Sequence, residues 1–218
     1  MELKGKKINF LGDSITEGSG ASCIENRYTD IIAREEGAVC RNYGIGGTRY
    51  ARQKTPSENP LHDLDFCSRA LEMDEDADIV VIFGGTNDFG HGDAEIGSPD
   101  DRTPETFWGA AHTLYQTVCE RFPNAQKVVI TPLHRLCEDC LRGDGYKSKD
   151  AAPLQTYVNI IREVAEYYSL PVLDLYKTSG LQPEIPLYQE KFMPDGLHPN
   201  DAGYRILADK IAKFLKTL

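Results

Sequence analysis

The sequence predicts an α/β protein: a three-layer α/β/α sandwich built on a mainly parallel sheet of five strands. Short apolar runs of the kind that form strands alternate with longer segments whose apolar residues recur at helical spacing. One short run, residues 78–83, consists almost entirely of β-branched and aromatic residues, which is typical of a central parallel strand covered on both faces. No repeat or linker divides the chain, so we expect residues 1–218 to form a single domain.

The first predicted elements are a strand, a helix and a second strand. Residues 8–11 form an apolar run that ends at Gly12. Residues 26–36 place apolar side chains on one helical face, and the glycine that follows favours the end of that helix. Residues 38–43 are predicted as the second strand, which a glycine-rich turn follows directly.

The middle of the chain continues the alternation. We predict a helix over residues 61–73 and the third strand over residues 78–83. A loop rich in Gly, Asp and Pro then covers residues 89–102. The next helix is expected to begin at Thr103 and to run to about residue 121, because Thr is a favourable N-cap and Pro is favoured at the first helical position.

The last third of the chain supplies two further strands and two helices. The strands are predicted over residues 128–131 and 171–175. A polar loop and a helix over residues 153–168 lie between them, and a second long loop follows. The final helix, residues 200–215, carries a continuous apolar stripe that is expected to face the core.

Polar motifs follow three of the predicted strands. Gly12-Asp13-Ser14 follows the first strand, Gly44–Gly47 the second and Gly84–Asp88 the third. The carboxyl ends of parallel strands meet at one edge of a sheet, where open α/β folds bind their ligands. A fourth motif, Asp195-Gly196-Leu197-His198, precedes the last helix.

These motifs contain the parts of a serine acyl-transfer site. A serine hydroxyl attacks an ester only when a base accepts its proton, and the base needs a group that orients it. Ser14 supplies the hydroxyl, His198 the base and Asp195 the carboxylate, while Asn87 offers an amide that can donate to an oxyanion. The sequence therefore predicts a serine esterase.

Taken together, the motifs resemble the sequence blocks of the SGNH hydrolases, also called the GDSL-type lipase and acylhydrolase family. The corresponding stretches are Gly12-Asp13-Ser14-Ile15-Thr16, Asn42-Tyr43-Gly44-Ile45-Gly46-Gly47, Gly84-Gly85-Thr86-Asn87-Asp88 and Asp195-Gly196-Leu197-His198. They occur in the family's order and span residues 12–198. Ile15 stands where the family usually has leucine, a change without chemical consequence.

The resemblance implies a flavodoxin-like SGNH hydrolase fold and a reaction that passes through an acyl-enzyme intermediate. It assigns the catalytic triad to Ser14, Asp195 and His198. It assigns the oxyanion hole to Ser14, Gly47 and Asn87, where Gly47 lends its backbone N–H and Asn87 its side-chain amide. We expect no cofactor and no metal ion.

Several of these residues also have purely structural explanations. Ser14 and Asp13 are good helix-capping residues, and we expect Asp13 and Asp88 to hold loops through backbone hydrogen bonds rather than to act as acids. His91 lies in a glycine-rich loop after Asn87, where a contact with substrate and a solvated side chain are equally plausible interpretations. His62 and His112 lie in predicted helices, which favours structural roles.

The substrate is less well defined by the sequence. No long apolar lid segment is present, and the loops at the active edge are polar, which favours short acyl esters, such as acetyl esters, of carbohydrates or other polar alcohols. A thioesterase or lysophospholipase that acts on longer acyl chains is the alternative. Two non-catalytic alternatives also stay open, a nucleotide- or flavin-binding module and a sugar-binding module.

Composition excludes some partners. The formal net charge is −10 and the pI is about 5.0, which disfavours binding to nucleic acid phosphates. No apolar run is long enough for a membrane span. We interpret the six cysteines as reduced thiols of a cytoplasmic protein, and the Cys137-x-x-Cys140 pair as two incidental thiols, because too few further ligands lie nearby for a metal site. The oligomeric state is left open.

Overall fold

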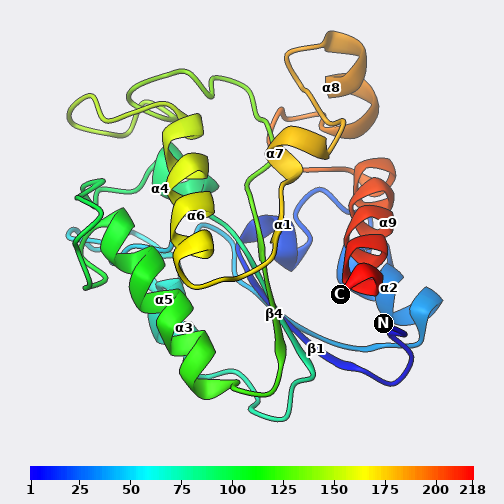
Figure 1. Ribbon diagram of the computed structural model, residues 1–218. Coiled ribbons are helices and arrows are strands. Elements are labelled where there is room, and N and C mark those ends of the chain that lie inside the picture. The colour runs from blue at the N-terminus through cyan, green and yellow to red at the C-terminus, as the bar shows by residue number, and fades with distance from the viewer.

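The computed structural model describes residues 1–218 and shows a five-stranded sheet between two layers of helices (Figure 1). The strands are β1 (Lys7–Gly12), β2 (Val39–Gly44), β3 (Ile79–Phe83), β4 (Gln126–Ile130) and β5 (Val172–Leu173). Neighbouring strands all pair in parallel, in the order β2-β1-β3-β4-β5. This confirms the predicted α/β sandwich, and the strand order is that of doubly wound, flavodoxin-like folds.

Nine α-helices and two short 3₁₀ helices connect and cover the strands. The helices are α1 (Ser14–Glu17), α2 (Tyr28–Glu36), α3 (Phe66–Ala70), α4 (Thr86–Gly90), α5 (Phe107–Arg121), α6 (Leu154–Tyr167), α7 (Leu175–Thr178), α8 (Pro186–Phe192) and α9 (Asp201–Thr217), with η1 (Ile24–Asn26) and η2 (Pro60–Asp63). α3, α5 and α6 lie on one face of the sheet, and α2 and α9 lie on the other (Figure 1).

Two apolar cores result, one on each face of the sheet. Alternate residues of β3 point to opposite sides: Val80 and Ile82 belong to the core under α5 and α6, whereas Val81 and Phe83 belong to the core under α2 and α9. All residues of β3 are buried, as predicted for a central strand. The sheet therefore fixes where each strand ends. It thereby also fixes the positions of the polar motifs that follow the strands.

The helix predicted over residues 61–73 is wrong in its extent. The structure has the 3₁₀ helix η2, a break, and then the short helix α3. The break has a local cause, because the Asp65 side chain accepts a hydrogen bond from the backbone N–H of Ser68 at 2.8 Å and so caps a new helix.

The predicted start of the fourth helix is also corrected. Thr106, not Thr103, is the N-cap of α5, and its hydroxyl accepts from the N–H of Gly109 at 3.2 Å. One helix through both residues would set them about 9 Å apart along its axis, whereas the backbone of Thr103 lies directly against Gly109.

The fifth strand is shorter than predicted. Only Val172 and Leu173 pair with β4, because Asp174 caps α7 through a hydrogen bond from the N–H of Lys177 at 3.1 Å. The second long loop, which the sequence left without secondary structure, contains α8. No helix is both long enough and apolar enough to cross a membrane.

Candidate active site

The first site motif lies where β1 meets α1. Asp13 is the N-cap of α1, and its carboxylate accepts from the N–H of Ile15 at 3.0 Å. Ser14 is consequently the first helical residue, and its Oγ lies 2.9 Å from Nε2 of His198. Gly12 has to be glycine in this turn, since a Cβ there would lie 1.9 Å from the hydroxyl of Thr16. The side chain of Ser14 is thus presented at the carboxyl end of a central strand.

The Asp195–His198 turn brings a carboxylate and an imidazole to the same point. Nδ1 of His198 lies 2.7 Å from Oδ2 of Asp195, while Oδ1 of Asp195 accepts from the N–H groups of Leu197 and His198 at 2.9 and 2.7 Å. Gly196 allows this tight turn because its φ is +78°. A three-residue spacing is therefore what lets one carboxylate bind both the backbone and the ring.

Hydrogen bonding sets the protonation of this pair. Burial alone would raise the pKa of Asp195, but its hydrogen bonds with the His198 side chain and with the N–H groups of His198 and Leu197 outweigh burial and lower that pKa. An ionised carboxylate only accepts, so Nδ1 of His198 carries the proton. Nε2 is then the acceptor for the hydroxyl of Ser14.

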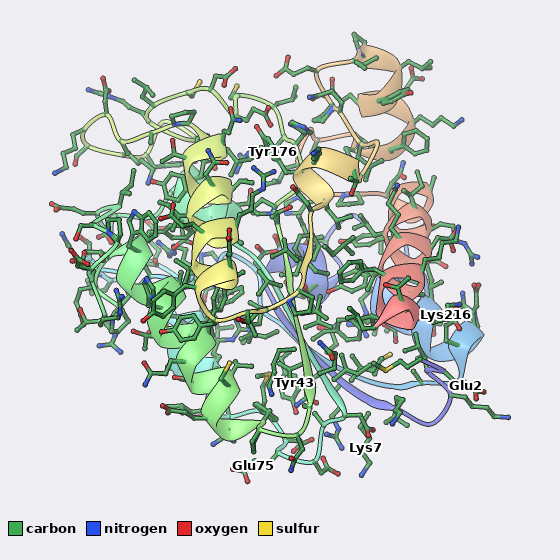
Figure 2. The ribbon with its side chains drawn as sticks, in the orientation of Figure 1. Glu2, Lys7, Tyr43, Glu75, Tyr176 and Lys216 are labelled. Atoms are coloured by element: carbon green, nitrogen blue, oxygen red, sulfur yellow. The ribbon has the colours of Figure 1, made fainter.

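The turn is held in place by the loop that follows β4. The N–H of Leu136 donates to the carbonyl of Gly196 at 2.9 Å, and a Cβ on Gly196 would lie 2.3 Å from the Leu136 side chain. In the same loop, the ring of His134 packs against Tyr176 of α7 with centroids 3.9 Å apart, and both side chains contact Glu138. Figure 2 labels Tyr176, which lies in α7 just after the carboxyl end of β5.

Hydrogen-bond donors lie on the other side of Ser14. The backbone N–H groups of Ser14 and Gly47 donate to no group within the protein. Gly47 has a φ of +74°, and a Cβ there would meet the ring of His62 at 2.7 Å. Asn87 in α4 uses one amide hydrogen to donate to the carbonyl of Thr48 at 3.0 Å, which leaves its second hydrogen available.

A buried arginine that sequence reasoning missed organises this region. Arg69 of α3 donates to Oγ1 of Thr48 at 2.8 Å, to the carbonyl of Gly12 at 3.1 Å, and to the carbonyl of Tyr43. Burial lowers the pKa of Arg69 to about 10, an effect that nearby Asp13 partly offsets, so the guanidinium stays charged at neutral pH. Arg69 thereby joins the ends of β1 and β2 to the loop that carries Gly47.

Two further side chains fix the same loop. Asp88 accepts from the N–H groups of Tyr50 and Ala51, both at 2.9 Å. Glu17, which the sequence did not single out, accepts from the N–H of Gly46 at 3.0 Å. Asp13 and Asp88 thus make the backbone hydrogen bonds expected of them.

The remaining predicted residue, His91, is hydrogen-bonded to Asn87 and not to Ser14. Its Nε2 is 3.2 Å from Oδ1 of Asn87. Burial, together with the neighbouring positive charges of Arg49, Arg135 and Lys147, lowers the pKa of His91 to about 4, so its ring is neutral near pH 7. His112 packs against Trp108 and lies 3.4 Å from the hydroxyl of Tyr168, as expected of a structural residue.

His91 also lines a cavity of about 650 Å³. Its walls come from three loops, residues 53–57, 91–97 and 146–151, and from Arg49. Most of these residues are polar or charged. Ser14 and His198 do not line this cavity; of the predicted site residues only His91 does, and His91 contacts Asn87.

Neither a metal site nor a disulfide accompanies these groups. No group of three or more His, Cys, Asp or Glu side chains in residues 1–218 is arranged to hold a metal ion. All six cysteines are free, and Cys137 and Cys140 are exposed.

Comparison with known protein families agrees with the geometry of the Ser14, His198 and Asp195 side chains. The family model described as GDSL-like Lipase/Acylhydrolase family matches residues 10–206. The chain belongs to the GDSL-like lipase/acylhydrolase family. Members of this family hydrolyse esters, and the protein is an ester-hydrolysing enzyme.

Individual relatives of this GDSL-like hydrolase extend over the whole chain. A GDSL esterase/lipase of Arabidopsis thaliana is 27% identical, and the match covers 97% of this chain and 86% of that protein. A crystal structure from Lactobacillus plantarum is 29% identical with a TM-score of 0.82, covering 99% of this chain and 98% of that one. A two-domain esterase active on acetylated mannans shares the fold at 24% identity, with a TM-score of 0.62, over 99% of this chain and 50% of its own.

Asp88 gives a testable pH dependence of stability. Burial raises the pKa of Asp88 to about 6, and hydrogen bonds from Ala51 and Tyr50 only partly offset this. A raised folded-state pKa favours the protonated form, so its contribution is fully present below about pH 4 and is lost as pH rises through about 6. We expect wild type to lose about 1–3 kcal/mol relative to Asp88→Asn over this range.

The measurement is urea unfolding of both proteins at several pH values between about 4 and 7. The carboxamide costs a backbone hydrogen bond at every pH, so only the change in the difference with pH reports the buried carboxyl. A difference between the two proteins that stays constant with pH would contradict the prediction.

Proposed function

We propose that the protein is a serine esterase that cleaves carboxylic esters through an acyl-enzyme, with Ser14 as nucleophile, His198 as base and Asp195 as the group that orients the base. The observation that carries this proposal is the chain of hydrogen bonds from Ser14 Oγ to His198 Nε2 at 2.9 Å and from His198 Nδ1 to Asp195 Oδ2 at 2.7 Å. Such a chain is the requirement for activating a serine at neutral pH.

Acylation begins with proton transfer from Ser14 Oγ to His198 Nε2. Oγ attacks the ester carbonyl carbon, and the carbonyl oxygen becomes an oxyanion. Asp195 stabilises the imidazolium that forms. The tetrahedral intermediate collapses when His198 returns the proton to the departing alkoxide, so the alcohol leaves and the acyl group stays on Ser14.

Deacylation repeats the same steps with water. His198 Nε2 accepts a proton from the water, whose oxygen attacks the acyl carbon. The second tetrahedral intermediate releases the carboxylic acid when the proton passes from His198 to Oγ of Ser14. The enzyme returns to its starting state, and no cofactor enters the balance.

The oxyanion hole is assigned to the backbone N–H groups of Ser14 and Gly47 and to the free amide hydrogen of Asn87. The two backbone groups have no partner within the protein, and Asn87 has one hydrogen to spare. Preorganised donors of this kind stabilise a charge that develops only during reaction. Close packing around Gly47 keeps its N–H in position.

Partial exposure of the base and a polar cavity nearby support a short acyl group on a polar alcohol. The leaving alcohol takes its proton from Nε2 of His198, whose side chain is 22% exposed. Most of the residues that line the cavity next to His91 are polar or charged. We propose acetyl or similarly short esters of carbohydrates or other polar alcohols as substrates. The related fold of the esterase active on acetylated mannans is compatible with this choice.

The alternative is hydrolysis of longer acyl chains by a thioesterase or lysophospholipase activity. One observation favours it, the cavity of about 650 Å³ next to His91, which has the volume for a longer group. Its polar lining argues against an alkyl chain, because burying methylene groups there would gain little.

The triad can be tested by Ser14→Ala and His198→Ala. Each is expected to lower kcat on p-nitrophenyl acetate by at least about 10³-fold, and the double variant to be little worse than either single one, because the residues act as a unit. Circular dichroism and thermal unfolding check that both variants fold. Activity above a few per cent of wild type in folded Ser14→Ala would remove Ser14 as the nucleophile.

A second test concerns the amide of Asn87. Asn87→Ala should lower kcat by about 10²-fold with little change in KM, since the hydrogen bond matures only in the transition state. Asn124→Ala is the matched control, because Asn124 is exposed and precedes β4 at the opposite edge of the sheet. A change confined to KM would mean that Asn87 contacts the ground-state substrate instead.

Acyl-chain preference separates the two substrate classes. An apolar tunnel would gain roughly 0.8 kcal/mol for each methylene buried, whereas an enclosed polar site gains little. We expect kcat/KM on p-nitrophenyl esters to be highest for acetate or propionate and to fall by octanoate. A steady rise to decanoate would favour the long-chain alternative, and acetylated sugars are the next substrates to assay.

A further inference from the structure

We infer that His91 is a positioning residue for the oxyanion hole: its ring holds the side-chain amide of Asn87 with the N–H₂ group turned toward the reacting oxygen. This inference rests on the proposed role of Asn87. It goes beyond the two sequence-based interpretations of His91, a contact with substrate and a solvated side chain.

The orientation of the amide follows from its two partners. The carbonyl of Thr48 lies 3.0 Å from Nδ2 of Asn87, and a carbonyl can only accept, so the N–H₂ end must face it. The oxygen end then faces Nε2 of His91 at 3.2 Å. Because Oδ1 also only accepts, Nε2 of His91 carries a hydrogen and donates it. No other side chain donates to this oxygen.

Local structure explains why His91 reaches this position. His91 follows the last residue of α4 and lies four positions, about one helical turn, after Asn87, which brings the two side chains into contact. Its own N–H donates to the carbonyl of Asn87 at 3.0 Å, which anchors the backbone of His91 whatever side chain it carries. The sequence Asn87-Asp88-Phe89-Gly90-His91 therefore builds the donor and its support together.

Two physical effects link this contact to catalysis. An amide rotated by half a turn would present its oxygen, not its hydrogens, to the developing oxyanion, and the bond from His91 opposes that rotation. A hydrogen bond received at the amide oxygen also polarises the amide, which strengthens its N–H groups as donors by a modest amount. Both effects act on the transition state, so they change kcat rather than KM.

The test uses a pair of variants at one position. His91→Leu removes the donor, whereas His91→Gln places an amide N–H close to the position of Nε2. We expect His91→Leu to lower kcat on p-nitrophenyl acetate by about five- to tenfold, with KM within about twofold of wild type. His91→Gln is expected to restore most of this loss. Thermal unfolding of both variants separates the effect from loss of the fold.

The deciding measurement is a double-mutant cycle with Asn87→Ala. If His91 acts only through Asn87, His91→Leu has no further effect on kcat once Asn87 is alanine. A full effect of His91→Leu in that background, a rise confined to KM, or no rescue by His91→Gln would overturn the inference.

The same cycle distinguishes the inference from the function on which it rests. A normal effect of Asn87→Ala combined with wild-type kcat in His91→Leu would overturn the role of His91 alone. Wild-type kcat in Asn87→Ala would overturn the oxyanion role of Asn87, and the inference with it. The fall in kcat expected for Ser14→Ala remains the separate test of the esterase mechanism.

Discussion

The site depends on the hydrogen bonds that Arg69 makes to the main chain. The sheet fixes where β1 and β2 end, but the loop that carries Gly47 belongs to neither strand and has to be tied to them. Arg69 does this by binding the carbonyl groups of Gly12 and Tyr43 and the hydroxyl of Thr48. A guanidinium suits the position because its several N–H groups point in fixed directions and stay protonated. The ring of Phe66, 5.2 Å from the guanidinium carbon, covers the same group.

Thr48 shows how closely the parts depend on one another. Its hydroxyl accepts from Arg69 and donates to the carbonyl of Ile45, while its own carbonyl accepts from the amide of Asn87. Thr48 is fully buried, so loss of any of these hydrogen bonds would leave a buried polar group unpaired and would lower the stability of the protein. A shift of Thr48 would therefore move Gly47 and Asn87 together. Buried polar networks of this kind specify one arrangement because every member has to be satisfied at once.

The sequence predicted the parts of the site that local pattern determines. Ser14 follows a strand, and Asp195 and His198 share one turn, so spacing alone limits where they can lie. Arg69 and Glu17 could not be found in this way, because their partners belong to other elements and come close only after the sheet forms. The limits of α3 and of β5 were missed for a related reason: the aspartates at positions 65 and 174 end one element by capping the next.

His62 and His91 illustrate the same limit in the site itself. The sequence shows both histidines, but it does not show which residues pack against them in the folded protein. His62 packs against Gly47, and His91 against Asn87. Each histidine therefore contacts a residue that is proposed as an oxyanion donor. A role in supporting a donor leaves no local sequence signal beyond helical spacing, and the contacts that suggest it are seen only in the structure.

Two carboxyl groups near the imidazole of His198 have opposite environments. Hydrogen bonds lower the pKa of the exposed Asp195, whereas burial raises the pKa of Asp13 to about 6, even though the bond from Ile15 and the nearby charges of His198 and Arg69 lower it. Asp195 is therefore ionised throughout the range in which a histidine titrates. Of the two carboxyl groups, only that of Asp195 is hydrogen-bonded to the ring. Asp13 makes no hydrogen bond to the ring and instead caps α1. The environments, not the residue type, thus separate the carboxylate proposed to be catalytic from a structural one.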